Sequence, residues 1–342
     1  MAADVMMATE IVAYGAPFGY RKRVVPELEP DEVLVRVVAS GLCSTDLHLL
    51  EGRWDLGELP RVPGHETAGI VESVGNRVSR SLVGTRVTVA LDVVCGRCVH
   101  CRTGQAQRCP NKSRIGFERD GGHAEYVAVP AINVVELPES VGFEAASILP
   151  DAVACMYHSL VAQGQVGIND TVVIHGSGGL GVHGVQIATH AGARVMATSR
   201  SRLRRDAAER YGAVPVDTSS GDAVSAVVDM CGAAGVDIVA DCIGTEASIR
   251  ESLAMVRPGG RVLVLAYVAE EFRVNSKDLM ANEKQLIGCR GSTYRDLQEV
   301  VELVANGVLE PVIGARVHLS KINEAADSLR RGEVSGRIVL TR

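Results

Sequence analysis

Short apolar runs broken by glycine and proline mark the chain between Glu32 and Pro130. The runs are rich in valine and are bounded by turn-forming residues, which is typical of short β-strands. Strands at this spacing predict a partly open β-barrel or a sandwich rather than strand–helix–strand units. The expected strands are Val33–Ala39, Gly69–Val74, Arg86–Ala90 and Ala124–Val129.

The pattern changes from Thr171 onward. Apolar strands there are separated by segments of helix length, which indicates a doubly wound parallel sheet. A helix over Ile322–Arg331 and a strand over Arg337–Thr341 then return the chain to the first domain. The expected strands of the parallel sheet are Thr171–His175, Arg194–Thr198, Val236–Ala240 and Arg261–Ala266.

The two patterns together predict an α/β protein with two domains. The chain has 342 residues, which is long enough for two separate hydrophobic cores. We expect one domain to comprise residues 1–150 and 290–342, and the other, inserted into it, to comprise residues 151–289.

The composition excludes several classes of protein. The chain is 46% hydrophobic and 22% charged, with a formal net charge of −6. Its densest basic stretch, Arg200–Arg205, is too short for a nucleic-acid surface. No run approaches the roughly 18 apolar residues of a membrane span, and Met1–Glu10 does not resemble a signal peptide. We therefore expect a cytoplasmic protein, whose nine cysteines need an explanation other than disulfides.

Four of those cysteines form a compact motif, in which Cys95, Cys98 and Cys101 are separated by two residues each and Cys109 follows after seven. Two-residue spacers allow successive thiolates to converge on one ion, and a fourth thiolate completes a tetrahedron. Such a closed site has no open position for a substrate, so it predicts a structural zinc. His100 lies inside the motif and is expected at the surface.

A second, dispersed set of residues contains a thiol, an imidazole and two carboxylates. Cys43 lies two residues after a glycine and His65 directly after one, both at strand ends. They would be two ligands of a catalytic zinc, which takes three protein ligands and leaves one position open. The third ligand must come from further along the chain, and these residues do not determine it. Asp46 is suited to hold the ring N–H of His65, and Glu66 lies beside the metal.

The first strand of the parallel sheet runs into a glycine-rich turn and then a helix. The turn has the spacing G-x-G-x-x-G, which in this context is a dinucleotide-binding fingerprint. Gly176 makes the tight turn, Gly178 lets the backbone approach the pyrophosphate and Gly181 permits close helix–strand packing. Gly179 and Leu180 complete the turn at the helix N-terminus, which favours anions.

The end of the next strand distinguishes the two nicotinamide cofactors. An NAD site usually has a carboxylate there, which holds the ribose 2′-hydroxyl. This chain has Ser199 and Arg200 instead, a hydroxyl and a guanidinium that suit a 2′-phosphate. The sequence therefore favours NADP, with NAD as the alternative. Arg204 and Arg205 are expected on a solvated helix face.

These motifs together resemble the zinc-containing alcohol dehydrogenases of the medium-chain dehydrogenase/reductase superfamily. The matching residues are the Cys43–His48 segment, Gly64–Glu66, the four-cysteine motif and the glycine fingerprint, and the likeness runs through the closing Gly336–Val339. The resemblance implies a GroES-like, partly open β-barrel catalytic domain and a Rossmann nucleotide domain. It also implies hydride transfer between a nicotinamide cofactor and a small alcohol or carbonyl compound, and a homo-oligomer, either a dimer or a tetramer.

The resemblance also suggests the third ligand of the catalytic zinc. The family often has a cysteine at the position of Asp151, and some members have aspartate. Asp151 keeps the charge of the site and replaces sulfur with a harder oxygen donor. As an alternative, Asp151 would serve as a helix N-cap. Cys155, one turn further on, is the nearby competitor and matches a family threonine beside the nicotinamide.

Further roles are implied by resemblance alone. Thr45 matches the hydroxyl that binds the substrate oxygen, and His48 matches the outer member of a proton relay. Glu66 matches a carboxylate that enters the coordination sphere during ligand exchange. Arg337 matches an arginine that reaches the cofactor phosphates.

Three alternatives remain open. A polyol or sugar dehydrogenase of the same superfamily would share this site chemistry and differ in its pocket. A zinc-free enone reductase generally lacks the metal-ligand positions, and a catalytically silent NADP-binding relative would lack catalytic residues that are present here. The substrate pocket is expected to involve Trp54, His123 and Cys289.

Overall fold

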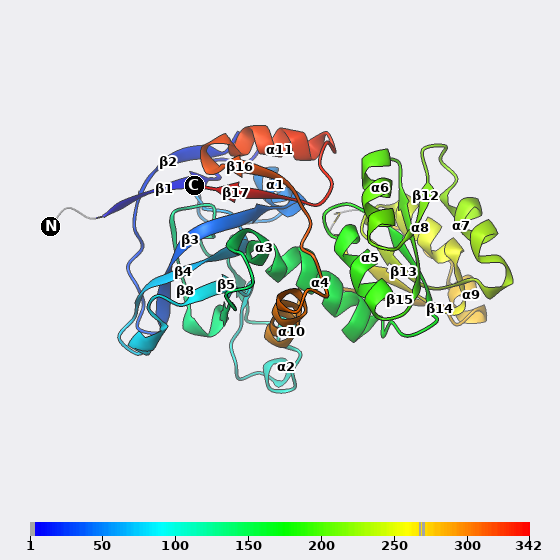
Figure 1. Cartoon of the computed structure of the whole chain (residues 1–342), viewed down its shortest axis with the longest axis horizontal. Coiled ribbons are helices and arrows are strands. Elements are labelled where there is room, and N and C mark those ends of the chain that lie inside the picture. The colour runs from blue at the N-terminus through cyan, green and yellow to red at the C-terminus, as the bar shows by residue number, and fades with distance from the viewer. Residues whose placement is uncertain (1–3, 267, 269–270) are drawn as a thin grey trace. The chain divides into compact units, whose positions relative to one another are not determined.

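A computed structural model describes residues 4–266, 268 and 271–342 of the chain (Figure 1). The chain divides into two compact units. The first unit comprises Met1–Ala154, Gly291–Gly307 and Ile313–Arg342, and the second comprises Cys155–Arg290 and Val308–Val312. Among the described residues, no helix is both long and apolar enough to cross a membrane.

The first unit is built on a mixed seven-stranded sheet, which is the GroES-like part of the fold. Its strands follow the order β16-β17-β3-β4-β5-β9, and β8 pairs with β3 outside this path. These strands are β3 (Glu32–Leu42), β4 (Glu66–Val74), β5 (Arg86–Val89), β8 (Tyr126–Pro130), β9 (Val134–Glu136), β16 (Ile313–His318) and β17 (Arg337–Thr341). Two small antiparallel pairs accompany the sheet, β1 (Val5–Glu10) with β2 (Gly19–Val24) and β6 (Asp92–Val93) with β7 (Ser113–Arg114).

Short helices cover and connect this sheet. They are α1 (Ser44–Leu50), α2 (Val99–Arg102), α3 (Phe143–Ser147), α10 (Tyr294–Ala305) and α11 (Ile322–Arg330). The buried interior of the sheet is almost entirely aliphatic, because aromatic residues make up only 4% of the chain. The central strand β3 has the final strand β17 on one side and β4 on the other. This arrangement brings three segments that are distant in the sequence to the same end of the sheet.

The second unit is a six-stranded parallel sheet of the Rossmann type, with the order β12-β11-β10-β13-β14-β15. The order reverses direction between β10 and β13, and right-handed crossovers place the helices of the two halves on opposite faces. Helices α5 and α6 contact each other, as do α7 and α8 (Figure 1). The strands are β10 (Thr171–His175), β11 (Arg194–Ser199), β12 (Val214–Asp217), β13 (Val236–Asp241), β14 (Val256–Val264) and β15 (Gln285–Gly288). The helices are α4 (Ala154–Tyr157), α5 (Gly181–His190), α6 (Arg202–Arg210), α7 (Ala223–Cys231), α8 (Glu246–Met255) and α9 (Ser276–Ala281).

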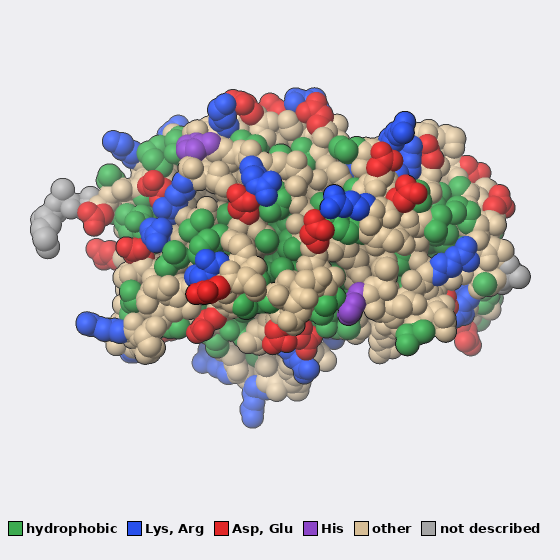
Figure 2. All heavy atoms as spheres, viewed as in Figure 1, with side chains coloured by type: hydrophobic (Ala, Val, Ile, Leu, Met, Phe, Trp, Pro, Cys, Tyr) green, Lys and Arg blue, Asp and Glu red, His purple; other side chains and the backbone are tan. Residues whose placement is uncertain are grey.

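The predicted α/β class with one GroES-like and one Rossmann unit is confirmed. The expected domain boundaries at 150/151 and 289/290 differ by up to four residues from those between the two compact units of the structure. Residues 308–312, expected in the first domain, belong to the second unit. The Gln186 side chain binds both the N–H and the C=O of Glu310, each at 2.8 Å, which ties this segment to α5. Acidic and basic side chains are interspersed over the face drawn in Figure 2.

Candidate active site

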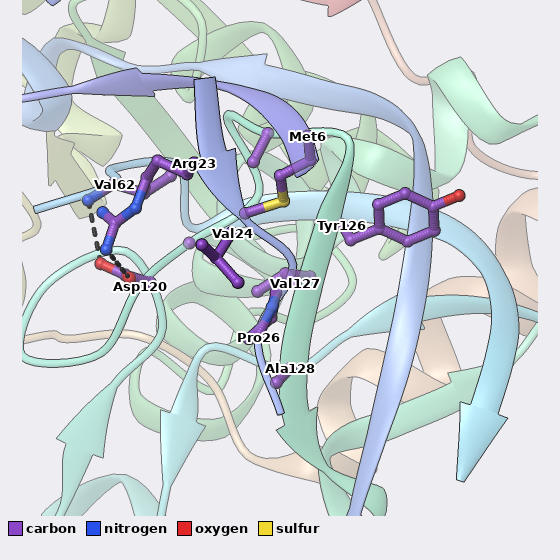
Figure 3. Close-up of a pocket in the computed structure, with 11 residues that line it drawn as sticks. Met6, Arg23, Val24, Pro26, Val62, Asp120, Tyr126, Val127 and Ala128 are labelled. Atoms are coloured by element: carbon purple, nitrogen blue, oxygen red, sulfur yellow. Dashed lines mark hydrogen bonds and ion pairs between the residues drawn. The ribbon is translucent and has the colours of Figure 1, made fainter. Parts of the chain in front are cut away.

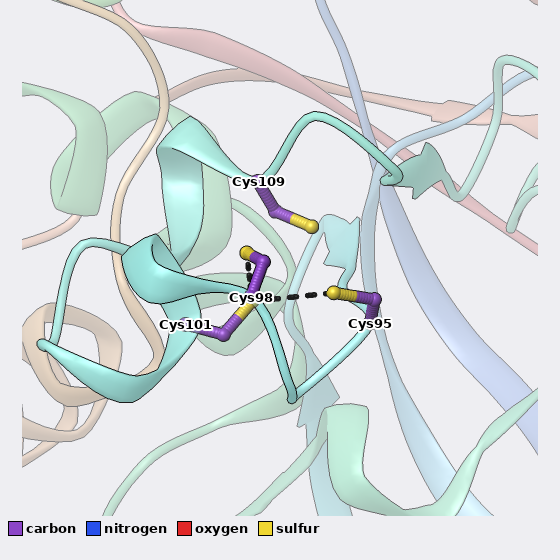
Figure 4. A group of neighbouring side chains, drawn as sticks. All are labelled: Cys95, Cys98, Cys101 and Cys109. Carbon is purple, nitrogen blue, oxygen red and sulfur yellow. Dashed lines mark hydrogen bonds between the residues drawn. The ribbon is translucent and has the colours of Figure 1, made fainter.

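The four-cysteine motif forms a tight cluster of sulfur atoms in the first unit (Figure 4). All four ligand atoms lie within 4.8 Å of one another, and no disulfide joins them. The Sγ of Cys98 is 3.5 Å from that of Cys101, which is 4.0 Å from that of Cys95. A zinc tetrahedron with bonds of about 2.3 Å has edges of about 3.8 Å, so the donor set fits zinc.

Backbone hydrogen bonds favour the metal-binding form of the Cys95 side chain. The N–H groups of Arg97 and Cys98 hydrogen-bond to the Cys95 thiol and lower its pKa to about 6. Because metal ligation requires the thiolate, this turn favours the binding form of the side chain. Cys98 lies at the N-terminus of α2, and Cys109 follows the turn Ala106–Arg108. Four sulfurs thereby enclose the position that an ion would take.

We expect Cys98→Ser to remove the structural zinc and loosen this lobe. Metal analysis should fall by about one zinc ion per chain, because three thiolates with one hydroxyl bind zinc poorly. Limited proteolysis should then cut between residues 95 and 109, where the zinc replaces a hydrophobic core. His100→Ala, in the same lobe but outside the sulfur cluster, should retain the metal and the resistance to protease. A Cys98→Ser protein with unchanged zinc content would contradict this assignment.

The second metal group comprises Cys43, His65 and Asp151, whose ligand atoms also lie within 4.8 Å of one another. Oδ2 of Asp151 is 3.6 Å from Sγ of Cys43 and 3.7 Å from Nε2 of His65. Cys43 follows β3 and caps α1, whereas His65 directly precedes β4. Since β3 and β4 are paired, their ends bring the thiol and the imidazole together. One sulfur, one nitrogen and one oxygen donor fit a catalytic zinc.

The position of Asp151 distinguishes between its two possible roles. The residue lies inside the π-helical turn Leu149–Val153, whose N-terminal cap is Ile148. Its carboxylate binds the Cys43, His65 and Arg337 side chains. Burial alone would raise the pKa of Asp151, but the hydrogen bond with His65 and the charge of Arg337 lower it to about 2. The carboxylate is therefore an anionic metal ligand rather than a helix cap.

Asp46 connects the two ligands Cys43 and His65. Oδ2 of Asp46 accepts a hydrogen bond from the backbone N–H of Cys43 at 2.8 Å, and Oδ1 lies 3.4 Å from Nδ1 of His65. Burial would raise the pKa of this completely buried carboxyl group, yet His65 and His123 hold the pKa below its ordinary value. Nδ1 of His65 therefore faces the carboxylate, and Nε2 faces the metal position.

A buried charge cluster lies behind the metal position. Arg337, at the start of β17, contacts both carboxylate oxygens of Glu66 at 2.7–3.0 Å and Oδ2 of Asp151 at 2.7 Å. Burial raises the pKa of Glu66 to about 7, although Arg337 acts in the opposite direction. Gly41 faces Glu66 across the sheet, where a Cβ atom would lie 1.9 Å from a carboxylate oxygen. The resemblance implied that Arg337 reaches the cofactor phosphates, whereas the structure places it on these two carboxylates.

Helix α1 carries the expected proton-relay residues Thr45 and His48. Oγ1 of Thr45 lies 3.5 Å from Sγ of Cys43, and His48 lies three residues further along, on the same face of the helix. Both side chains are half-buried. Burial and the charge of Arg53 lower the pKa of His48, so its ring is neutral and able to accept a proton.

Two aromatic side chains, Trp54 and Phe117, pack beside the metal ligand His65, and the sequence predicted only the first of them. The ring centroid of Phe117 lies 5.5 Å from that of His65 and 5.9 Å from that of Trp54. The Arg114 guanidinium lies 4.0 Å from the Phe117 centroid and 4.4 Å from the Trp54 centroid, and it forms an ion pair with Glu118. Trp54 was expected to line the pocket, but no sequence pattern identifies Phe117 or Arg114 as its neighbours.

His123 was expected in the substrate pocket and is instead completely buried. A separate cavity of about 150 Å³ lies elsewhere in the first unit, between the β1–β2 hairpin and β8 (Figure 3). It is lined mainly by apolar side chains, with the Arg23–Asp120 ion pair at one end. None of the metal-ligating residues lines it.

The glycine fingerprint connects β10 to α5 in the second unit. Gly176 has φ of +96°, and a Cβ atom on Gly181 would lie 2.3 Å from the carbonyl oxygen of Gly176. The space above Gly178 is open, and the nearest atom to the position of its missing Cβ is Nη1 of Arg204, at 3.8 Å. This turn has the room and the free N–H groups that a pyrophosphate requires.

The expectation that Arg204 and Arg205 lie on a solvated helix face is wrong. Arg205 pairs with Asp217 and donates to the carbonyl oxygen of Ser199 at 2.9 Å. Arg204 is partly buried, and its Nε has no hydrogen-bond partner among the described residues. Burial lowers its pKa, as expected for a cation without a counter-ion. Arg200 is exposed at the strand end, and Ser199 is buried.

Comparisons with known proteins agree with this geometry. The alcohol dehydrogenase GroES-like domain model matches residues 29–139, and the zinc-binding dehydrogenase model matches residues 179–306. An alcohol dehydrogenase of Geobacillus stearothermophilus is 32% identical over 98% of this chain and 99% of its own length. The chain belongs to the zinc-binding alcohol dehydrogenase family.

Two further relatives show the range of this family. A D-arabitol-phosphate dehydrogenase of Enterococcus avium is 30% identical over 90% of this chain and 89% of its own. A crystal structure described as a zinc-binding dehydrogenase from Sinorhizobium meliloti 1021, bound to NADP, has a TM-score of 0.89 and 32% identity, covering 99% of this chain and 100% of its own. The protein is thus an NAD(P)-dependent zinc dehydrogenase with a structural four-cysteine site and a catalytic Cys43–His65–Asp151 site.

Proposed function

We propose that this dehydrogenase transfers a hydride between NADP(H) and a small alcohol or the corresponding aldehyde or ketone. The observation that carries the proposal is the convergence of Cys43, His65 and Asp151 on one position, with the carboxylate of Asp151 still partly exposed. Three donors with an accessible side are the arrangement of a catalytic rather than a structural zinc.

A zinc ion at this site supplies a Lewis acid for the substrate oxygen, and the nicotinamide supplies or accepts the hydride. Asp46 orients the imidazole of His65, and Arg337 balances the charge of Asp151 and Glu66. We assign to Thr45 the hydrogen bond to the substrate oxygen, because its hydroxyl lies beside the ligand Cys43. His48, whose lowered pKa keeps the ring neutral, accepts the proton from this hydroxyl and passes it outward.

Two features of the second unit, the end of β11 and Arg204, favour NADP over NAD as the cofactor. The strand end at Ser199 and Arg200 has no carboxylate to repel a 2′-phosphate. Arg204 adds a partly buried guanidinium beside the open turn at Gly178, without an acidic partner among the described residues. A buried cation without a counter-ion is costly, and a phosphate group would supply the missing charge.

The test measures NADPH- and NADH-dependent reduction of a panel of aldehydes and ketones, together with cofactor affinity. The intact protein should reduce members of the panel with NADPH preferred over NADH. Arg204→Ala should weaken NADPH binding about tenfold or more, because hydrogen bonds to charged groups contribute about 1.5–3 kcal/mol. Arg202→Ala is the matched control, since Arg202 lies on the same helix and its side chain is 87% exposed.

Each of the other outcomes would count against one part of the proposal. A preference for NADH, or equal effects of Arg204→Ala and Arg202→Ala, would contradict the NADP assignment. Turnover of polyols or sugar alcohols alone would favour the second candidate, a polyol-type dehydrogenase, which the D-arabitol-phosphate relative suggests. No turnover of any compound by protein with two zinc ions and bound NADPH would contradict the enzymatic proposal.

A further inference from the structure

His123 lies immediately behind the catalytic metal site. Its side chain is completely buried, and its backbone N–H donates to the carbonyl oxygen of Pro63 at 3.0 Å. Gly64, next to the ligand His65, has φ of +99°, and a Cβ atom there would lie 2.5 Å from Nδ1 of His123. A glycine at position 64 is therefore needed to admit this imidazole so close to the metal ligand.

The Ser40 side chain holds one end of the His123 ring in place. The Ser40 hydroxyl donates to the carbonyl oxygen of Glu66 at 2.9 Å and lies 2.8 Å from Nδ1 of His123. This contact fixes the orientation of the ring, so that Nε2 points away from Ser40.

The opposite end of the ring faces Asp46. Nε2 of His123 lies 3.8 Å from Oδ2 of Asp46, is buried, and has no hydrogen-bond partner among the described residues. The same Oδ2 accepts the backbone N–H of Cys43, and the other oxygen faces Nδ1 of His65. One carboxylate thus contacts His123, the backbone of one metal ligand and the ring of another.

We propose that His123 is a positioning residue for the catalytic zinc, which acts through Asp46 on Cys43 and His65. The ring is anchored at Nδ1 by Ser40 and presents a polar edge at Nε2 to a carboxylate that has no exposure to solvent. A fully buried carboxylate is stable only when polar groups surround it. By restricting Asp46, His123 fixes the direction of the His65 imidazole and thereby increases the affinity of the site for zinc.

The experiment measures zinc affinity of the catalytic site by competition with a chelator, in full-length protein that keeps its structural zinc. His123→Phe preserves the ring volume and removes both polar ends, and we expect zinc to bind about 10–100-fold more weakly. His123→Asn keeps an amide near Ser40 only and should weaken zinc binding similarly. His123→Gln extends an amide N–H toward Asp46 and should recover affinity to within about threefold of the original.

Two readouts separate positioning from packing and from the proposed activity. Zinc affinity is measured without cofactor or substrate, so the result does not depend on which compound the enzyme reduces. Cobalt substituted at the site should give a visible absorption spectrum that changes in His123→Asn and is retained in His123→Gln. Unchanged zinc affinity in His123→Phe and His123→Asn, or equal losses in Asn and Gln variants, would overturn the proposal. If the Phe variant does not fold, the Asn and Gln pair still decides the question.

Discussion

Asp151→Ala removes the catalytic zinc and abolishes turnover. We expect metal analysis to fall from about two zinc ions per chain to about one, because the oxygen donor that lies 3.6 Å from Cys43 and 3.7 Å from His65 is lost. Activity should decrease by at least about a thousandfold, since Lewis-acid stabilisation of the reacting oxygen contributes several kcal/mol and about 1.4 kcal/mol corresponds to tenfold. Zinc content and NADPH oxidation are measured on the same samples.

Two variants serve as controls for this prediction. Cys155→Ala removes a buried thiol one helical turn from Asp151 that is not part of the metal group, and it should keep both zinc ions. Asp151→Cys restores a sulfur ligand of the same charge and should recover zinc. An Asp151→Ala protein with two zinc ions would show that another side chain completes the site.

Arg337→Met should destabilise the first unit by about 3–5 kcal/mol, because it leaves Glu66 and Asp151 without their buried cation. Arg337 is 4% exposed, and its guanidinium contacts both carboxylates within 3.0 Å. The free energy of unfolding can be measured in denaturant through the fluorescence of Trp54, the single tryptophan, which lies in the same unit.

A surface ion pair on the adjacent strand provides the matched control for Arg337. Arg316 in β16 pairs with Glu144, and the two side chains are 57% and 38% exposed. Arg316→Met should therefore cost less than about 1 kcal/mol. Adding Glu66→Gln to Arg337→Met should recover part of the stability, since one unpaired charge is removed. Equal losses in the Arg316 and Arg337 variants would show that the buried cluster contributes no more than a surface pair.

The sequence predicted best those features that depend on residues close together in the chain. The two-residue spacers of the cysteine motif place their sulfurs in a single lobe, and the glycine spacing requires a turn between β10 and α5. Both features are local, so their geometry follows from the backbone alone. The strand boundaries followed the apolar runs for the same reason, although β14 begins five residues before the predicted start at Arg261.

Features that depend on strand pairing could not be predicted in this way. Arg337 meets Glu66 only because β17 and β4 flank β3. The sequence around Arg337, one residue before the first pair of β17 with β3, contains nothing that identifies Glu66 as its partner. The third metal ligand illustrates the same limit, since Asp151 was suggested by resemblance and not by any spacing from Cys43 or His65.

The local sequence also misplaced one arginine, which was expected on a solvated helix face. Arg204 lies on a strongly charged helix, which is typical of a solvated surface. The turn at Gly178, however, leaves a space beside that helix, and a long side chain can enter it. Similarly, His123 was expected to line the substrate pocket, but the glycine at position 64 allows its ring to pack inside.

The strand β17 has a consequence for the order in which the protein matures. Arg337 is synthesised 271 residues after Glu66, and the whole second unit is translated in between. Until Arg337 leaves the ribosome, the two carboxylates beside the metal position have no cation and favour solvated conformations. We therefore expect the nucleotide-binding unit to fold during translation, and the metal-binding unit to complete its fold and acquire its catalytic zinc only after translation has passed β17.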